Sequence, residues 1–523
     1  MERLKSRIAW MLRINRLYGP DETWTSGEVF SAAFAGGCHP GPVSESKVSR
    51  WETGLTDVPQ KAVRRYEQIL GLPTWSLVST ADIVGRYLSP SVDALRAADQ
   101  KCLHVAEEHS LEEFLDRVAS SSTLTGAEWY EAARLFTSLP GLLLRRGEWE
   151  DICYRLLVET VAADGDAWRP RFEAYCRLLQ HPSAQRFAAA ACADWARSRD
   201  SRVFIEPLSL LDGCRHPDAA TAILQQLASP TNDDAFAGAL LASIRKAEDG
   251  HFSEPQVTAV AKVALSVLSD RPCLNPEWCS YATAIVARLP SEVRARVRRF
   301  AHNPVPFADQ AARAALPTEN DCGVLRSLIV ARSISLLPRE VSRFVDKVLP
   351  ALVGELLYSP LADTRLYSAF LIRATPYRQP VASSLAWGLG HIRDCRTSQL
   401  TVRILEALRI LGCAEQRIVA ERLSVPSQPF QVQNAAFRAL GHIGGFSDDA
   451  FWHERFSLHS SPACAGKISS ERLLNHAVYA IGMSRNAPEL RRIAADRCLT
   501  RSVSASAKWW LALPGHMLAS AER

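Results

Sequence analysis

The chain has 523 residues, of which 47% are hydrophobic and 22% are charged, and its formal net charge is +5. This composition is ordinary for a folded globular protein and excludes an intrinsically disordered one. The length suffices for about three to four compact domains or for one extended repeat array. The mild positive charge permits a local basic patch but does not make the whole chain a nucleic-acid binder.

Thirteen cysteines are scattered along the chain, and no two of them are spaced Cys-x-x-Cys. The first ten residues, MERLKSRIAW, are charged and amphipathic, unlike a secretory signal. No stretch approaches 18 uninterrupted apolar residues, so no transmembrane helix is expected. Together these features predict a cytoplasmic protein with reduced thiols and no membrane contact.

Helix signals dominate the first 88 residues, where five short helices are predicted. In residues 2–18, apolar residues recur every three or four positions, Asn15 interrupts the stripe, and Arg16 falls on the opposite face. A second helix is predicted to begin near Thr25, with Glu28 completing a capping box, and to stop at Gly36 and Gly37.

The third predicted helix begins at Ser44, which is a good N-cap, and it ends at Gly54. Two apolar residues, Val48 and Trp51, stand three positions apart and can anchor this helix on a core. A fourth helix is predicted over residues 59–70, opened by a proline and closed by a glycine, and a fifth within residues 74–88.

Beyond residue 90, helical segments rich in alanine and leucine alternate with short breaks, and strand-like alternation is scarce. Four segments resemble one another: LAWGLGHIRD (385–394), ILEALRILGC (404–413), AAFRALGHIGG (435–445) and HAVYAIGMS (476–484). Their spacing suggests stacked helix pairs of the HEAT or armadillo kind, and an irregular all-helical domain is the alternative. The predicted fold is therefore all-α: a five-helix domain at 1–88, then a helical-repeat region at 100–523 that allows a division near 250–320.

The stretch VSESKVSRWETGLTDVP, followed by VRRYEQILGL, resembles the Cro/repressor-like (XRE) helix-turn-helix family. The resemblance covers about 65 of the 523 residues, and its most specific part is VSRWETG. It implies a DNA-binding domain whose second motif helix enters the major groove of double-stranded DNA.

The resemblance also implies roles for single residues. The residues implied to face bases are Ser44, Glu45, Ser46 and Arg50, and those implied to lie near phosphates are Lys47 and Thr53. Ser49 shares the polar face, and these seven residues form the predicted DNA-binding site. Trp51 would belong to the core, Glu52 would make a structural hydrogen bond, and Gly54 would form the left-handed cap.

One departure from the family pattern concerns the connection before this helix. The residues AGGCHPGP lengthen it by roughly eight positions relative to the tight turn that the motif normally has. Within residues 44–66, five basic side chains stand against three acidic ones, which gives a local charge of only +2. We therefore expect dimerisation or a protein partner to enlarge the footprint on DNA.

These observations predict a sequence-specific DNA-binding transcriptional regulator, with no enzymatic activity, no cofactor and no metal. Three alternatives stay open: a helical domain that uses this motif for protein contacts, an interaction scaffold localised to DNA, and a helical-repeat enzyme acting on DNA. The common motifs for nucleotide hydrolysis, zinc proteolysis and serine hydrolysis do not occur, and SESK at 44–47 lacks its partner motifs.

Four further features are interpreted as structural. Residues 291–300, SEVRARVRRF, carry arginines on one face that are typical of a solvated helix. His391 and Cys395 have a chelating spacing, but two ligands do not make a metal site, and the same holds for Cys38-His39. The adjacent tryptophans at 509 and 510 are expected to cap the last helix pair.

Overall fold

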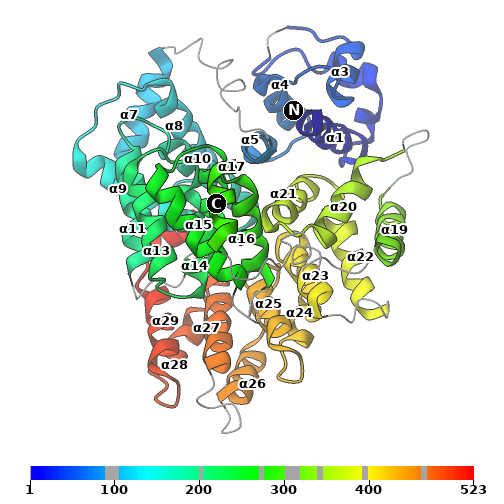
Figure 1. Cartoon of the computed structure of the whole chain (residues 1–523). Helices are drawn as coiled ribbons and strands as arrows, with labels where there is room; N and C mark the ends of the chain where they lie inside the picture. Colours follow the sequence, from blue (N-terminus) through cyan, green and yellow to red (C-terminus); the bar gives the residue numbers. More distant parts are fainter. Residues whose placement is uncertain are drawn as a thin grey trace. The chain divides into compact units, whose positions relative to one another are not determined.

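The computed structural model describes residues 2–39, 41–88, 105–198, 203, 205–269, 276–300, 319–338, 345–391, 398–460 and 468–523 (Figure 1). In these residues the regular structure is helical, and the β-type pairing is an isolated bridge between Gly36 and His39. The predicted all-α class is thus confirmed. Among the described helices, none is long and apolar enough to cross a membrane.

The chain divides into two compact units. Unit 1 comprises Met1–Lys101, Pro317–Ser359 and Asp363–Ala512, and unit 2 comprises Cys102–Leu316, Pro360–Ala362 and Leu513–Arg523. The helices at the N-terminus therefore share a unit with those near the C-terminus, which the linear order of the chain does not indicate.

The N-terminal part of unit 1 has five α-helices and one 3₁₀ helix: α1 (Glu2–Tyr18), η1 (Glu22–Thr25), α2 (Gly27–Ala32), α3 (Glu45–Glu52), α4 (Gln60–Ile69) and α5 (Ser76–Leu88). Their common core is aromatic. The ring of Phe34 lies 5.5 Å from that of Trp51, and Phe30 lies 4.9 Å from Tyr66, with all four side chains fully buried. Such edge-on and tilted aromatic contacts supply large apolar burial in a small domain.

The predicted start of the second helix is wrong by one residue. Ser26 is the N-cap, and its hydroxyl accepts from the backbone N–H of Val29 at 3.3 Å. Thr25 is instead the last residue of η1. The helix also ends at Ala32, before the two glycines that were expected to stop it.

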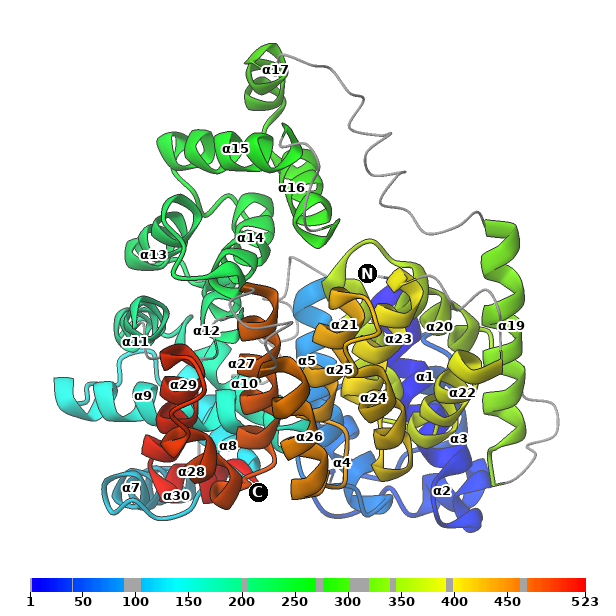
Figure 2. The same cartoon turned by 90° about the horizontal axis from the view of Figure 1, so that it is seen from below.

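The C-terminal part of unit 1 contains these helices: α19 (Glu319–Ser335), α20 (Val348–Tyr358), α21 (Ala362–Arg373), α22 (Arg378–His391), α23 (Ser398–Leu411), η4 (Ala414–Gln416), α24 (Arg417–Leu423), α25 (Phe430–Leu440), α26 (Asp449–Ser460), α27 (Ile468–Met483), α28 (Ala487–Ala495) and α29 (Arg501–Ala512). Four of them, α23, α25, α27 and α29, pack in succession, with α24, α26 and α28 between them in the chain (Figure 2).

Helix α1 packs against the C-terminal part of the same unit. Its Trp10 ring stacks on Tyr377 at 6.1 Å and 4°, and the indole N–H donates to Asp346 at 2.9 Å. The side chain of Asn15 donates to the carbonyl of Ala374 at 2.7 Å. The guanidinium of Arg7 pairs with Glu355. The residues of α1 after Ser6 are therefore buried or half-buried. Asn15, which interrupts the predicted apolar stripe, joins α1 to the C-terminal part of the unit through its hydrogen bond.

Three of the four similarly placed glycines lie where a later part of the chain approaches closely. A Cβ on Gly482 would lie 2.3 Å from the Trp510 ring, and one on Gly441 would lie 3.2 Å from Tyr479. A Cβ on Gly412 would lie 2.9 Å from the Ile443 side chain. A Cβ on Gly390, in contrast, would meet no atom within 4 Å. The recurring glycines thus allow close packing at three positions, two of them against side chains of a later helix.

We expect Gly482→Ala to destabilise the protein by about 1–3 kcal/mol, because the added methyl group overpacks the contact with Trp510. Gly390→Ala is the matched control, since it adds the same methyl group to a helix with open space around it. This control is expected to be neutral or stabilising by up to about 1 kcal/mol. Thermal unfolding of the two full-length variants tests this, and equal midpoints would contradict the assignment of a close contact.

Unit 2 contains α7 (Val105–Ala119), α8 (Gly126–Ser138), α9 (Arg146–Ala162), α10 (Gly165–Leu178), α11 (Gln185–Arg197), α12 (Ile205–Ser209), η2 (Leu210–Gly213), α13 (Pro217–Ala228), α14 (Asp233–Glu248), α15 (Glu254–Ser269), α16 (Pro276–Arg288), α17 (Ser291–Phe300) and α30 (Gly515–Ala521). The odd-numbered helices from α9 to α17 pack in succession. A second row is formed by α12, α14 and α16.

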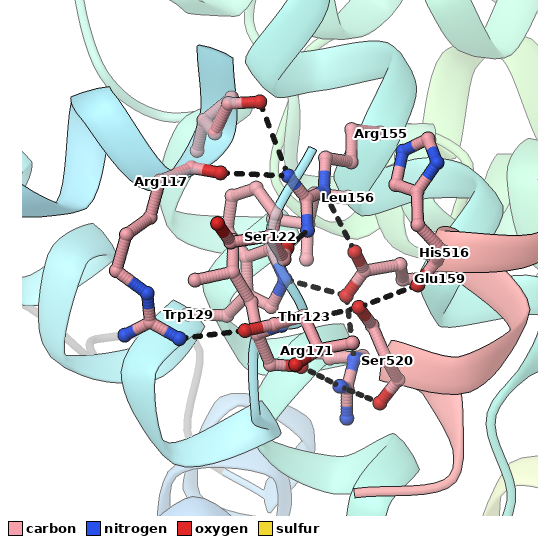
Figure 3. A network of polar contacts seen from close by, with 12 residues as sticks. Arg117, Ser122, Thr123, Trp129, Arg155, Leu156, Glu159, Arg171, His516 and Ser520 are labelled. Atoms are coloured by element: carbon pink, nitrogen blue, oxygen red, sulfur yellow. Dashed lines mark hydrogen bonds and ion pairs between the residues drawn. The ribbon is translucent and has the colours of Figure 1, made fainter. Parts of the chain in front are cut away.

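A buried polar network ties the first helices of unit 2 together (Figure 3). The carboxylate of Glu159, which has no exposed surface, accepts from Trp129 at 2.7 Å, Arg155 at 2.9 Å and Arg171 at 3.3 Å. The guanidinium of Arg171 also donates to backbone carbonyls, including that of Ser520 in α30 at 2.5 Å. Because the N–H groups of Trp129, Arg155 and Arg171 are paired with this carboxylate or with backbone carbonyls, we infer that the network stabilises the packing of these helices.

Candidate nucleic-acid interface

Helix α3 separates its buried and exposed side chains as predicted. Val48 is 1% exposed and Trp51 is 2% exposed. The seven predicted site residues are all exposed: Ser44, Glu45, Ser46, Lys47, Ser49, Arg50 and Thr53. The structure therefore brings the predicted set together on one polar surface, anchored from beneath by two apolar side chains.

Both ends of α3 are capped by local hydrogen bonds. The hydroxyl of Ser44 accepts from the backbone N–H of Lys47 at 3.3 Å, as an N-cap does. At the other end Gly54 has φ of 73°, in the left-handed region, and the N–H of Leu55 donates to the carbonyl of Arg50 at 3.0 Å. The predicted capping roles of Ser44 and Gly54 are confirmed.

A buried ion pair fixes the C-terminal end of α3. The two carboxylate oxygens of Glu52 each accept from the guanidinium of Arg16 at 2.7 Å, and one also accepts from the Tyr66 hydroxyl at 2.9 Å. The same guanidinium donates to the carbonyls of Trp24 and Thr25 at 2.9 and 3.0 Å. This network joins α1, η1, α3 and α4, so the orientation of α3 depends on a bidentate contact.

Burial affects the titration of this network. Burial raises the pKa of the Tyr66 hydroxyl well above its usual range, and the neighbouring charge of Glu52 raises it further. For Arg16, burial by itself lowers the pKa, but the hydrogen bonds and charge of Glu52 leave it raised. The guanidinium of Arg16 is therefore charged and the phenol of Tyr66 neutral at neutral pH.

The lengthened connection between α2 and α3 is held by Arg65 from outside it and by the packing of its own His39. The guanidinium of Arg65 in α4 donates to the carbonyls of Ala33, Phe34 and Ala35 at 2.7, 3.0 and 3.2 Å. His39 is 8% exposed, and its ring packs 5.1 Å from that of Phe34. Residues 33–39 are therefore held in place, and the polar face of α3 stays exposed.

Contacts within the fold leave fewer cations near α3 that are available to bind a polyanion such as DNA. Arg64 pairs with Glu67 at 2.6 Å and lies over the Trp75 ring at 3.8 Å. The charged groups of Arg64 and Arg65 are thus both used in contacts within the fold. Arg50 and Lys61 are exposed, and their charged groups make no ion pair with the described residues. Of the five basic residues counted in the sequence, two therefore have structural roles.

Two site residues have neighbours that the sequence does not indicate. The ammonium of Lys47 lies 5.3 Å from the centroid of the Trp51 ring, a cation–π contact. A Cβ on Gly27 would lie 2.5 Å from the carboxylate of Glu45, so this carboxylate lies beside the first residue of α2. The guanidinium of Arg50, in contrast, makes no such contact with the described residues.

Sequence reasoning missed three positioning residues. Arg16 and Arg65 were treated as ordinary charges, yet their guanidinium groups hold α3 and the loop before it. Glu67 is 1% exposed and accepts from the backbone N–H groups of Leu77 and Val78 at 2.7 and 3.0 Å, which caps α5. No local pattern marks such side chains, because their partners lie elsewhere in the chain.

The other features noted in the sequence have these outcomes. Trp510 is 2% exposed and packs against Gly482, as expected for a capping residue. Residues 291–300 form α17, and the side chain of Arg298 lies outside the described residues. Cys395, the proposed partner of His391, also lies outside them. Among the described residues, no group of three His, Cys, Asp or Glu side chains is placed to hold a metal ion.

Comparison with known proteins returned no matching family model, no matching curated protein and no matching solved structure.

Proposed function

We propose that this chain is a sequence-specific transcriptional regulator that inserts α3 into the major groove of double-stranded DNA. One observation carries the proposal: α3 presents an uninterrupted exposed polar surface while the Arg16–Glu52 ion pair and the Trp51 side chain hold it from below. A short helix that presents its polar N-terminal residues outward on a fixed support is the arrangement that reads base edges.

The chemistry of the surface suits this role. The guanidinium of Arg50 can donate two hydrogen bonds to the O6/N7 edge of guanine, and the carboxylate of Glu45 can accept from cytosine. Hydroxyls such as that of Ser46 can contact either bases or phosphates. Lys47 and Thr53 would lie near the phosphates, which sets the register of the helix without reading sequence.

The small number of free cations near α3 predicts weak binding by one copy, because phosphate neutralisation supplies most of the affinity. A homodimer or a protein partner acting through α19–α29 would enlarge the footprint. We expect this regulator to act in the cytoplasm, without a cofactor and without catalysis.

Selection of duplexes from a random DNA pool by the full-length protein tests the function. The parent is expected to enrich one motif. Arg50→Ala is expected to bind that motif more weakly by about 1–3 kcal/mol and to lose discrimination at one base pair, because a bidentate contact to guanine is removed.

Arg326→Ala is the matched control, since it removes an exposed arginine from α19 of the same unit. It is expected to leave motif and affinity unchanged. The proposal fails if the parent enriches no motif at moderate salt, or if Arg50→Ala binds the selected duplex as tightly as the parent does.

A further inference from the structure

Positive charge is concentrated in one short segment of unit 1. The whole chain has a net charge of +5, and residues 485–508 contain six basic and two acidic residues, a net charge of +4. Both acidic residues lie next to the same arginine: Arg492 bonds to Glu489 at 2.5 Å and lies 3.9 Å from Asp496. One arginine therefore contacts both local carboxylates.

Of the five other cations of this segment, four are exposed: Arg491, Arg497, Arg501 and Lys508. None of the four forms an ion pair with a residue that the structure describes. We call these four residues, the helices α28 and α29 and the turn between them, which carries Arg497, the basic hairpin. Its four exposed cations compare with three beside α3, where Lys47, Arg50 and Lys61 are exposed and form no ion pair with the described residues.

The cations of the basic hairpin are held by a packed helix pair. Residues of both helices are buried, including Ile493 and Val503, each 0% exposed. The hydroxyl of Ser504 in α29 donates to the carbonyl of Ala494 in α28 at 2.9 Å, which ties the two helices together. Arg501 and Lys508 stand seven positions apart and therefore share one side of α29. The charges are thus presented by a folded surface.

The side chains of the hairpin fit phosphate groups. Three of the four cations are arginines, whose planar fork matches a phosphate, and the hydroxyls of Thr500 and Ser502 lie in the same segment. Between Arg501 and Lys508, the residues of α29 are small or hydroxylated, apart from the buried Val503. A membrane-binding helix presents several bulky apolar side chains beside its cations, whereas the large apolar side chain exposed in α29 is Leu511, beyond Lys508. The geometry therefore favours the backbone of a nucleic acid.

We propose that the basic hairpin is a second DNA-contacting surface, which binds the phosphates of duplex DNA without reading sequence. The choice of duplex DNA rests on the proposed function of α3. The hairpin and α3 lie at opposite ends of unit 1 in both views (Figures 1 and 2), so they contact separate stretches of duplex. The hairpin supplies the phosphate contacts that the surroundings of α3 lack.

The test measures how the affinity of the full-length protein for a fluorescent duplex of random sequence depends on salt, between about 50 and 200 mM. The triple variant Arg497→Gln, Arg501→Gln and Lys508→Gln is expected to lower the slope of log affinity against log salt by about 2 to 3, because each phosphate contact contributes about 0.9. The three side chains are exposed, so the fold is expected to persist, and thermal unfolding checks this.

A matched triple variant removes three exposed cations elsewhere in unit 1: Arg326, Lys347 and Arg422, each changed to Gln. It is expected to leave the slope unchanged. Equal slope losses in the two triple variants would show a general charge effect and would overturn the inference, as would an unchanged slope in the hairpin variant. A hairpin variant that loses binding to phosphatidylserine vesicles but keeps binding to the duplex would overturn it in favour of a membrane.

The two proposals fail separately. Suppose that selection enriches no motif, but the hairpin variant still shows a smaller slope of log affinity against log salt on random duplex. The proposed role of α3 is then wrong, and the phosphate-binding role of the hairpin is supported. Suppose instead that Arg50→Ala abolishes the motif preference, while the hairpin variant keeps the salt slope of the parent. The hairpin inference is then wrong, and the proposed role of α3 is supported.

Discussion

Glu52→Ala is expected to destabilise the N-terminal helices of unit 1 by about 3–5 kcal/mol, because removal of one partner leaves the other charge buried and unpaired. Both side chains of this ion pair are nearly inaccessible to solvent: that of Arg16 is 9% exposed and that of Glu52 is 3% exposed. The substitution also removes the acceptor of the Tyr66 hydroxyl. Hydrogen exchange of the α3 amides, measured on the full-length protein, reports the free energy of opening.

Two further substitutions show where this effect originates. Glu52→Gln keeps an acceptor for Tyr66 but removes the negative charge opposite Arg16, so an intermediate loss is expected. Glu45→Ala removes an exposed carboxylate from the same helix and is expected to stay within about 0.5 kcal/mol of the parent. If Glu45→Ala accelerated exchange as much as Glu52→Ala does, the buried ion pair would not be what holds α3.

Trp10→Ala is expected to cost about 3–5 kcal/mol, the range found when a large buried aromatic side chain is removed. The indole is 4% exposed, stacks on Tyr377 and donates to Asp346. The same carboxylate accepts from the backbone N–H groups of Val348 and Leu349 at 2.9 Å, which caps α20. Faster hydrogen exchange is therefore expected in α20 as well as in α1.

Trp10→Phe separates packing from hydrogen bonding at this position. It keeps a ring against Tyr377 but removes the donor to Asp346, so we expect a loss of about 1–3 kcal/mol. Leu55→Ala is the exposed control, because Leu55 is 76% accessible and lies in the same group of helices. Normal exchange in α20 of Trp10→Ala would show that α1 and α20 are not coupled through this contact.

The packing of α1 also decides which protein should be used in DNA-binding experiments. Trp10, Asn15 and Tyr18 are each at most 7% exposed, and each contacts a residue between 346 and 377. A fragment of the first 90 residues would expose these side chains to water. The full-length chain with single substitutions is therefore the appropriate material for the selections.

Local features of the sequence determined much of the architecture. Periodic apolar residues predicted the helices, and the caps at Ser44, Gly54 and Gly71 are confirmed, the two glycines with φ of 73° and 63°. The buried and exposed sides of α3 were also predicted from the spacing of Val48 and Trp51 alone. These features depend on residues within about one or two helical turns, where helix geometry determines which side chains share a face.

Only the tertiary structure decided which charges are used within the fold. Arg16 and Glu52 are 36 residues apart, Arg7 and Glu355 are 348 residues apart, and no local pattern pairs them. The sequence counted Arg64 and Arg65 with the cations near α3, but contacts made after folding commit both to structure. The four free cations of the basic hairpin were equally hidden, because a charge is available to a partner only when no carboxylate or carbonyl from another part of the chain is packed against it.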